Sequence, residues 1–344
     1  MQPVTLSSPA QALGQMRQHI DIFHCPHCGG TLAADTQVGC LACGRSFTVE
    51  DGIPCLYAPT DPQASGEATT RQVRAFYEET PFPNYEDLET IQDLVHKAEK
   101  GLFARLLNDQ VPFNARVLEV GCGTGQLTNY LGVAQRAMFG ADMTMNSLKL
   151  ANEFRARNQL RNVGFYQMNL YRPIFKDESF DLVLCNGVLC ASAEPYRGFQ
   201  SICPLVKRGG HLLIGTYNTY GRLITDFRRG VIRLLGQRFV FLDPHLRNEK
   251  LGKRKKEAWL ADQYFHPHES KQSFGEVLAW FDKHGFDFVY GIPSPKAFVP
   301  FSEDDAMFEP HAAGNWLDHL IVQTELMAKG SYEGGFFVMI GKRR

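Results

Sequence analysis

From residue 115 onward, short apolar runs alternate with stretches that have the apolar periodicity of helices, and this alternation limits the fold more than any other feature. Seven of these runs read as strands, at residues 115–120, 137–141, 163–167, 180–185, 210–217, 286–290 and 336–342. Strands that alternate with helices along a chain pair in parallel and carry helices on both faces of the sheet. The sequence therefore predicts a doubly wound, Rossmann-like α/β sheet of seven strands.

The first strand leads into a glycine-rich loop, Gly121-Cys122-Gly123-Thr124-Gly125, which precedes a helix. Glycines allow the backbone to turn sharply and to approach a ligand closely. Asp142 stands at the end of the second strand, where a carboxylate can accept hydrogen bonds from both hydroxyls of a ribose. These features predict a nucleotide-type cofactor, but dinucleotide-dependent dehydrogenases share them.

Three details favour a methyltransferase over a dehydrogenase. The glycines have the spacing GxGxG, which leaves less provision for a pyrophosphate than GxGxxG; Glu119 precedes the first glycine by two residues; and the chain ends in a strand entered from a helix and a glycine pair. Residues 117–127, 140–143, 180–189 and 207–217 resemble the motifs of class I S-adenosylmethionine (SAM)-dependent methyltransferases. The resemblance implies SAM as the cofactor and the strand order 3-2-1-4-5-7-6.

The resemblance also implies roles for individual residues. Glu119, Gly121 and Gly123 match positions that line the methionine part of SAM, Asp142 the position that holds the ribose, and Met143 one that packs near the adenine. Many relatives have an Asp at the position of Asn169, where it binds the adenine amino group; an Asn oxygen can accept the same hydrogen bond without charge. Asn186 matches a residue that faces the reactive centre. The full expected SAM site consists of Glu119, Gly121, Cys122, Gly123, Gly125, Asp142, Met143, Asn169, Leu170 and Asn186.

The sequence departs from the family after the fourth strand. Many relatives carry a pair of histidines there, whereas this chain has Cys190 and Ala191, which cannot replace a histidine base. We expect Cys190 to be buried, as cysteines often are. The departure leaves open a protein that binds SAM as a scaffold without catalysis.

Four of the nine cysteines form two CxxC pairs, Cys25/Cys28 and Cys40/Cys43, each followed closely by a glycine. Two such turns supply the four thiolates of a closed, tetrahedral zinc site, in which zinc has a structural role. The other five cysteines are scattered, so the distribution predicts a metal site in a reducing compartment and a cytoplasmic protein.

Residues 21–57 resemble a small zinc-ribbon family that includes the activator subunit of several RNA and protein methyltransferases, most specifically in the segment 51–54. The resemblance implies that the ribbon packs against the methyltransferase part of the same chain. Residues 21–58 hold one Arg and four Asp or Glu, a balance that argues against contact with nucleic acid.

The expected organisation has four parts: a polar lead at 1–20, the zinc ribbon at 21–58, a linker with a helical, aromatic lid at 59–110, and the methyltransferase domain at 111–344 with an inserted lid at about 218–262. The insertion carries eleven Lys or Arg and five Asp or Glu, a net charge of +6, against −7 for the rest. A lid helix with solvated charges, an interfacial helix and an RNA contact all remain open, and residues 251–259 are expected to form a mobile basic loop.

Candidate acceptor-site residues come from two segments. Phe76, Tyr77 and the aromatic stretch 81–85 resemble the lid that small-molecule methyltransferases fold over SAM, and aromatic rings attract a sulfonium cation. His266 and His268 flank a proline before a helix that starts near 270–273, where a histidine could remove a proton or cap the helix. We take Tyr77, His266 and His268 as the catalytic candidates. The acidic group at 303–305 with His311 reads as a surface loop.

The net charge of −1 does not favour nucleic acid as a partner, and no apolar run approaches the length of a membrane span. We therefore expect methyl transfer to an N, O or S atom of a small molecule, a thiol included, in an enclosed site. An RNA or protein methyltransferase that uses the basic insertion is the alternative. A homodimer through the lid helix and a helix at about 315–329 is also open.

Overall fold

The computed structural model describes residues 13–60, 65–83, 88–247, 252–333 and 335–344. Its centre is one seven-stranded sheet with the order β11-β12-β10-β9-β6-β7-β8. Counted along the chain and read from the other edge, this is the expected order 3-2-1-4-5-7-6, with β12 antiparallel to both of its neighbours. The strands are β6 (Arg116–Val120), β7 (Ala137–Asp142), β8 (Val163–Gln167), β9 (Phe180–Asn186), β10 (Val206–Tyr217), β11 (Phe286–Ile292) and β12 (Phe336–Arg343).

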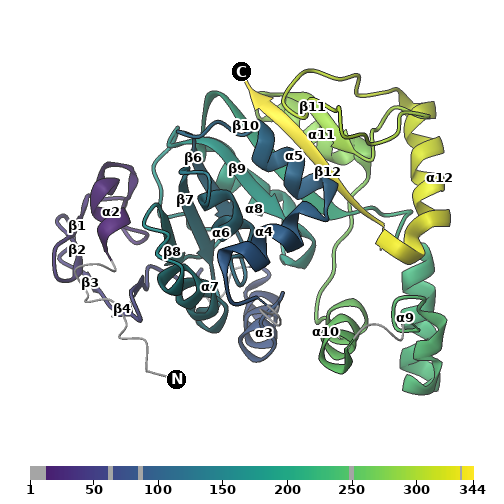
Figure 1. Cartoon of the computed structure of the whole chain (residues 1–344), viewed down its shortest axis with the longest axis horizontal. Helices are drawn as coiled ribbons and strands as arrows, with labels where there is room; N and C mark the ends of the chain where they lie inside the picture. The colour runs from purple at the N-terminus through teal and green to yellow at the C-terminus, as the bar shows by residue number, and fades with distance from the viewer. Residues whose placement is uncertain (1–12, 61–64, 84–87, 248–251, 334) are drawn as a thin grey trace.

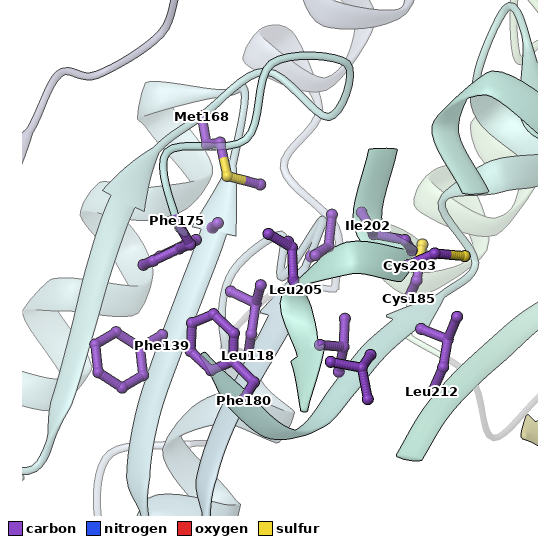
Figure 2. Packing of buried hydrophobic residues seen from close by; sticks show 14 of the residues in the cluster. Leu118, Phe139, Met168, Phe175, Phe180, Cys185, Ile202, Cys203, Leu205 and Leu212 are labelled. Atoms are coloured by element: carbon purple, nitrogen blue, oxygen red, sulfur yellow. The ribbon is translucent and has the colours of Figure 1, made fainter. Parts of the chain in front are cut away.

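Each face of the sheet is covered by helices, because successive side chains of a strand point to opposite faces. Val117 belongs to the apolar cluster formed with α4 (Ile91–Glu99), α5 (Leu102–Gln110), α6 (Gln126–Gly132) and α7 (Met145–Arg157). Its neighbour Leu118 belongs to the opposite cluster, formed with α8 (Pro195–Ile202), α11 (Phe274–Lys283) and part of α12 (Trp316–Glu333). Figure 2 shows this second cluster, in which Phe139, Phe175 and Phe180 pack against one another.

The cysteine-rich unit packs against the β8 edge of the sheet (Figure 1). It consists of α2 (Gly14–Gln18), β1 (Leu32–Ala34), β2 (Val38–Cys40), β3 (Ser46–Phe47), β4 (Val49–Glu50) and β5 (Ile53–Pro54). Phe23 pairs with Phe175, and Cys55 pairs with Gln167 at the end of β8. The unit therefore shares the core of the larger domain, as expected for a ribbon that packs within its own chain.

The insertion after β10 contains α9 (Leu223–Leu235), the 3₁₀ segment η4 (Gln237–Leu242) and α10 (Lys253–Tyr264). The expectation of a basic loop at 251–259 is wrong from Lys253 onward. This stretch forms the first turns of α10, because Lys, Glu and Ala are good helix formers. Residue 251 lies outside the described residues.

Helix α3 (Glu67–Glu79) precedes the sheet. Its first turn occupies the end of the stretch, starting at residue 59, that the sequence predicted as a linker. Of the aromatic stretch 81–85, Asn84 and Tyr85 lie outside the described residues. As expected, a helix starts after Ser273, which caps α11. In the described part of the chain, no helix is long and apolar enough to cross a membrane.

Candidate functional site

A cavity of about 460 Å³ opens at the carboxyl ends of β6, β7, β9 and β10, where ligands bind in open α/β sheets. Twelve of the thirteen residues expected to bind SAM or to act on the acceptor line it: Tyr77, Glu119, Gly121, Cys122, Gly123, Asp142, Met143, Asn169, Leu170, Asn186, His266 and His268. Gly125 is not among the lining residues. It begins α6 at a φ of 69°, and a Cβ there would lie 2.6 Å from the ring of Phe165. Its role is to shape the loop.

The lid segment, at Phe82 and Pro83, packs against the glycine loop. Gly123 has a φ of 52°, and a Cβ at this position would lie 2.6 Å from the carbonyl oxygen of Phe82. The next residue, Thr124, donates a hydrogen bond from its hydroxyl to the carbonyl oxygen of Pro83. Glycine is thus required where two backbones meet over the cavity, and the lid is in place above the cofactor loop.

Asp142 is held in a single orientation at the end of β7. Its Oδ1 accepts hydrogen bonds from the backbone N–H and the hydroxyl of Thr144, at 2.9 and 2.7 Å, and its Oδ2 accepts one from the N–H of Gly123 at 2.9 Å. Burial raises the pKa of Asp142, and these hydrogen bonds act against that shift. The carboxylate is preorganised to accept hydroxyls of a ligand in the cavity.

Glu119 is 7% exposed, and its carboxylate accepts a hydrogen bond from the hydroxyl of Thr128. Burial raises the pKa of this carboxyl to about 7, because desolvation disfavours the charged form. A cationic group of a ligand beside Glu119 would favour the carboxylate. The residue is therefore suited to hold the amino group of a methionine-like ligand.

The side-chain amide of Asn169 makes two hydrogen bonds within the protein. Its Nδ2 donates to the carbonyl oxygen of Ala58 at 2.8 Å, and its Oδ1 accepts from the N–H of Tyr171 at 3.0 Å. Ala58 follows β5, so the segment leaving the cysteine-rich unit orients a residue of the cavity wall. One lone pair of Oδ1 remains for a ligand.

Asn186 ends β9 and supplies a test of whether the cavity fits a polar ligand. Its Oδ1 is buried and has no hydrogen-bond partner among the described residues. A Cβ on Gly215 would lie 1.9 Å from this oxygen, so glycine is needed beside it. A buried carbonyl oxygen without a partner is costly, and a donor on a bound ligand would satisfy it.

The acceptor end of the cavity is formed by α3 and the loop after α10. The ring of His266 lies 5.1 Å from that of Phe76 and 5.4 Å from that of Tyr77, between centroids. The backbone N–H of His268 donates to Nδ1 of His266 at 3.2 Å. Neutral His266 therefore carries its proton on Nε2 and cannot accept another there. Nε2 of His268 is buried and has no hydrogen-bond partner among the described residues.

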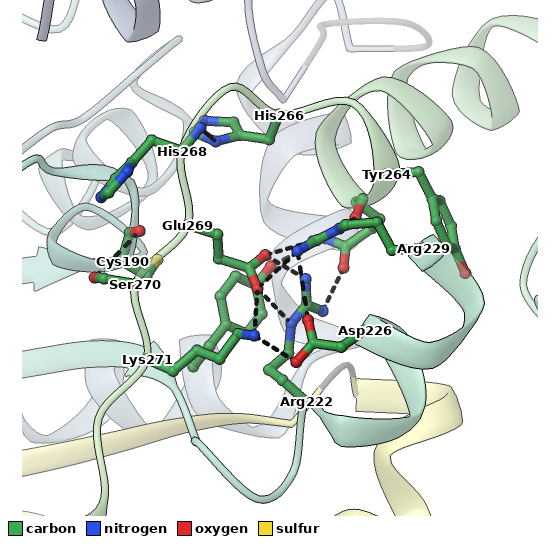
Figure 3. A network of polar contacts seen from close by, with 12 residues as sticks. Cys190, Arg222, Asp226, Arg229, Tyr264, His266, His268, Glu269, Ser270 and Lys271 are labelled. Carbon is green, nitrogen blue, oxygen red and sulfur yellow. Dashed lines mark hydrogen bonds and ion pairs between the residues drawn. The ribbon is translucent and has the colours of Figure 1, made fainter. Parts of the chain in front are cut away.

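Cys190 forms part of the wall, as the expectation of a buried cysteine implied. It is 4% exposed, and its thiol donates to the carbonyl oxygen of Gly187 at 3.3 Å. Its own carbonyl oxygen accepts the N–H of Ser270 at 2.7 Å. The residue thus ties the loop that carries the histidines to the end of β9 (Figure 3).

Glu269, in the loop between α10 and α11, also lines the cavity and was not expected from the sequence, because its partners come from the distant α9 segment. Arg222 and Arg229 of the α9 segment both bind its carboxylate, and Lys271 lies 3.9 Å away (Figure 3). Burial alone would raise the pKa of Glu269, but the hydrogen bonds and charges of the two arginines outweigh it and lower the pKa. The completely buried Arg222 also stacks on the ring of Tyr217.

Three carboxylates line the cavity, and one of them, that of Glu269, is already paired with Arg222 and Arg229. Glu119, Asp142 and Glu269 line it, whereas no Lys or Arg stands among its described lining residues. An anionic ligand would find no cationic partner, while a sulfonium, an ammonium or a neutral aromatic would be accommodated.

The four cysteines of the two CxxC pairs come together, with all four Sγ atoms within 4.8 Å of one another. The Sγ atoms of Cys25 and Cys43 are 3.9 Å apart, and those of Cys28 and Cys40 are 3.5 Å apart. These distances are close to the sulfur–sulfur spacing of about 3.8 Å that follows from a tetrahedral ion with metal–sulfur bonds of about 2.3 Å. The glycines that follow, Gly29 and Gly44, have φ values of 72° and 68°. The cluster fits a four-thiolate metal site.

Comparison with known proteins agrees with this geometry. Residues 113–246 match a family described as a methyltransferase domain. An uncharacterised protein from a Synechococcus strain is 27% identical over 260 residues, which cover 66% of this chain and 61% of that protein. A ubiquinone biosynthesis O-methyltransferase from Coxiella burnetii is 29% identical over 126 residues, or 36% of this chain and 50% of that enzyme. The matches thus span less than two thirds of these relatives.

Among solved structures, a SAM-dependent methyltransferase from Thermotoga maritima aligns with a TM-score of 0.43 at 16% identity, over 79% of this chain and all of that one. The strand order, the cavity at the carboxyl ends and the family match agree on the nature of the larger domain. Residues 113–246 of this chain thus match a methyltransferase domain, and a cluster of four cysteines lies on their N-terminal side.

Proposed function

We propose that this chain transfers a methyl group from SAM to a small-molecule acceptor enclosed in the cavity. The observation that carries the proposal is the continuity of the cavity. It runs from Glu119 and Asp142 at the cofactor loop to His268 at the acceptor end, under the lid formed by Phe82 and Pro83. Both substrates of a methyl transfer could thus be held in one space from which water is excluded.

SAM supplies the electrophilic methyl group, so the protein needs mainly to align the two substrates. Asp142 would hold the ribose hydroxyls, and Glu119 the amino group of the methionine part. The free lone pair of Asn169 would accept from the adenine amino group, and the unpaired oxygen of Asn186 would meet a donor of the bound pair. Met143 and Leu170 would enclose the adenine by apolar contact.

His268 would take the proton of the acceptor. Its buried Nε2 faces the same cavity as the cofactor loop, and neutral histidine is a suitable base near pH 7. Tyr77 and His266 would form the aromatic wall beside the sulfonium. The name of the Coxiella burnetii relative supports an oxygen acceptor, and a hydroxyl is the kind of group that needs a base.

The cysteine cluster would hold structural Zn²⁺. Four thiolates complete a tetrahedral site and leave no position for water, so the ion would act by stabilising the cysteine-rich unit. We expect about one zinc per chain in the purified protein. Cys40→Ser should remove the zinc and lower the melting temperature, whereas Cys203→Ser, at a buried cysteine outside the cluster, should leave the zinc content unchanged.

Methyl-labelled SAM, incubated with the protein and cell extract that is then separated into small-molecule, RNA and protein fractions, tests the proposal. We expect label in the small-molecule fraction. Label in RNA or protein would overturn the proposal and favour a macromolecular acceptor at the basic insertion. Bound SAM with no label in any fraction would favour a non-catalytic scaffold.

A further inference from the structure

Helix α9 exposes several of its large apolar side chains to the solvent. Leu223, Phe227 and Leu234 lie on one face of the helix, and they are 49%, 70% and 85% exposed. The side that faces the protein is mixed: Arg222, just before the helix, is completely buried, Thr225 is 5% exposed and the apolar Ile232 is 2% exposed. A surface helix of a globular protein normally buries its apolar face and exposes its polar face. The three exposed side chains Leu223, Phe227 and Leu234 thus have little cover within the described part of the chain.

The exposed apolar surface extends beyond the helix on both sides. Tyr220 before α9, Leu235 at its end and Phe241 in η4 are 47%, 50% and 55% exposed. We call the set Tyr220, Leu223, Phe227, Leu234, Leu235 and Phe241 the α9 face. Exposed apolar groups that cluster in this way mark interaction sites, whereas single ones are common on any protein.

Basic groups accompany the α9 face. Residues 218–262 have a net charge of +6, while the rest of the chain has −7. Arg233 and Arg238 are exposed beside the face, and the side chain of Lys253 on α10 is 91% exposed. Two acids of the insertion are engaged within the protein: Asp226 pairs with Lys271 and Arg229, and Asp243 accepts hydrogen bonds from Tyr264 and Trp259.

We propose that the α9 face docks onto the surface of a bilayer that contains anionic phospholipids. An interfacial helix has apolar side chains that enter the boundary of the acyl region and basic side chains that reach the phosphates. Phe227 and Leu234 would supply the deepest contacts, and Arg233 and Arg238 would lie at the headgroups. The proposal places the protein at a membrane surface and does not depend on the identity of the methyl acceptor.

Charge complementarity favours a bilayer over a second copy of the chain. In a two-fold dimer, each surface patch meets the same patch of its partner. The exposed basic side chains of the two insertions, such as Arg233, Arg238 and Lys253, would then face each other and repel. An anionic bilayer offers both the opposite charge and an apolar layer for the exposed side chains.

Sedimentation of the full chain with lipid vesicles tests the proposal. We expect binding to phosphatidylcholine vesicles that contain about 30% phosphatidylglycerol, little binding to pure phosphatidylcholine, and a severalfold decrease when NaCl rises from about 0.1 to about 0.5 M. The double variant Phe227→Ser/Leu234→Ser should lower binding at least about tenfold, because both apolar contacts are lost. It should keep the far-UV circular dichroism spectrum and melting temperature, since both side chains are largely exposed.

Phe298→Ser is the matched control, because Phe298 is 83% exposed in the loop after β11, outside the insertion. It should bind vesicles like the original protein. Absence of binding to the anionic vesicles, or equal binding by the double variant, would overturn the proposal. A dimer in solution that the double variant turns into a monomer, without vesicle binding, would do so as well and would assign the α9 face to a second copy.

Discussion

The two ends of the cavity are built in different ways. At the cofactor end, Glu119 and Asp142 stand on neighbouring parallel strands, and their hydrogen-bond partners Thr128 and Thr144 are nine and two residues away in the chain. At the acceptor end, Tyr77, Tyr217 and His268 come from three separate segments. The arginines that form ion pairs with Glu269 come from the α9 segment. Local chain geometry thus positions the two carboxylates of the first end, although Ala58 orients Asn169 there from a distant segment, while long-range ion pairs support the second end.

We therefore expect substitutions at one end of the cavity to leave the function of the other end unchanged. Changes at the acceptor end should alter turnover or acceptor binding and leave SAM affinity unchanged. Changes at the cofactor end should alter SAM affinity first.

The largest effect is expected at the acceptor end. His268→Gln should lower kcat about 10²- to 10⁴-fold, because the base would be lost, while the Kd for SAM should stay within about twofold. Steady-state kinetics and calorimetry measure the two quantities. His96→Gln, at an exposed histidine of α4, is the control and should leave both unchanged. A parallel loss of SAM affinity in His268→Gln would contradict the independence of the two ends.

At the cofactor end, Asp142→Ala should weaken SAM binding about 100-fold, since two ribose hydroxyls lose a charged acceptor and the N–H groups of Gly123 and Thr144 lose theirs. Calorimetric titration with SAM measures the change. Asp304→Ala, in an exposed acidic loop, should bind SAM normally. Unchanged affinity in Asp142→Ala would show that the ligand does not lie against β7.

The ion-pair network offers an intermediate test. Arg229→Met removes a guanidinium that binds both Glu269 and the carbonyl oxygen of Gln263, and should lower the free energy of unfolding by about 1.5–3 kcal/mol. Because the network supports the acceptor wall, we expect a raised KM for the acceptor and an unchanged Kd for SAM. Glu269→Gln should make the effect of Arg229→Met smaller, since the pair would already be broken.

The smallest effect is a pH dependence. Burial raises the pKa of Glu119 to about 7, so without ligand this carboxyl stabilises the fold below about pH 4.5, and that contribution is lost as the pH rises through 7. A cationic group of SAM favours the carboxylate form of Glu119. The affinity of the protein for SAM should therefore increase about tenfold between about pH 6 and about pH 8. Glu119→Gln should abolish this slope. A slope that persists in this variant would belong to another group.

Much of the fold could be predicted from the sequence. The seven apolar runs became β6 to β12 with boundaries shifted by a few residues, because strand and helix periodicities are local properties. The four-cysteine cluster was predicted equally well, since two CxxC turns need only approach each other to complete four ligands. The prediction of a loop at 251–259 was wrong from Lys253 onward. It took the high charge of this stretch as a sign of a loop, whereas Lys and Glu favour helices.

The candidate site was predicted in part. Residues that follow a strand end, such as Asp142 and Asn186, could be placed because parallel strands end at the same edge of the sheet. Glu269 could not, because the sequence does not show that Arg222 and Arg229 reach it from α9. The exposure of Leu223, Phe227 and Leu234 on α9 could not be predicted either, since amphipathicity alone indicates that apolar side chains of a surface helix are buried.

The sequence by itself determined the class of fold, the cofactor loop, the cysteine cluster and the order of elements along the chain, because each depends on spacings of a few residues. Only the tertiary structure decided how the two histidines of the acceptor end are hydrogen-bonded, which carboxylates line the cavity and which side chains of α9 meet the solvent. Those properties depend on hydrogen bonds and ion pairs between segments far apart in the chain, and their partners are chosen only when the chain packs.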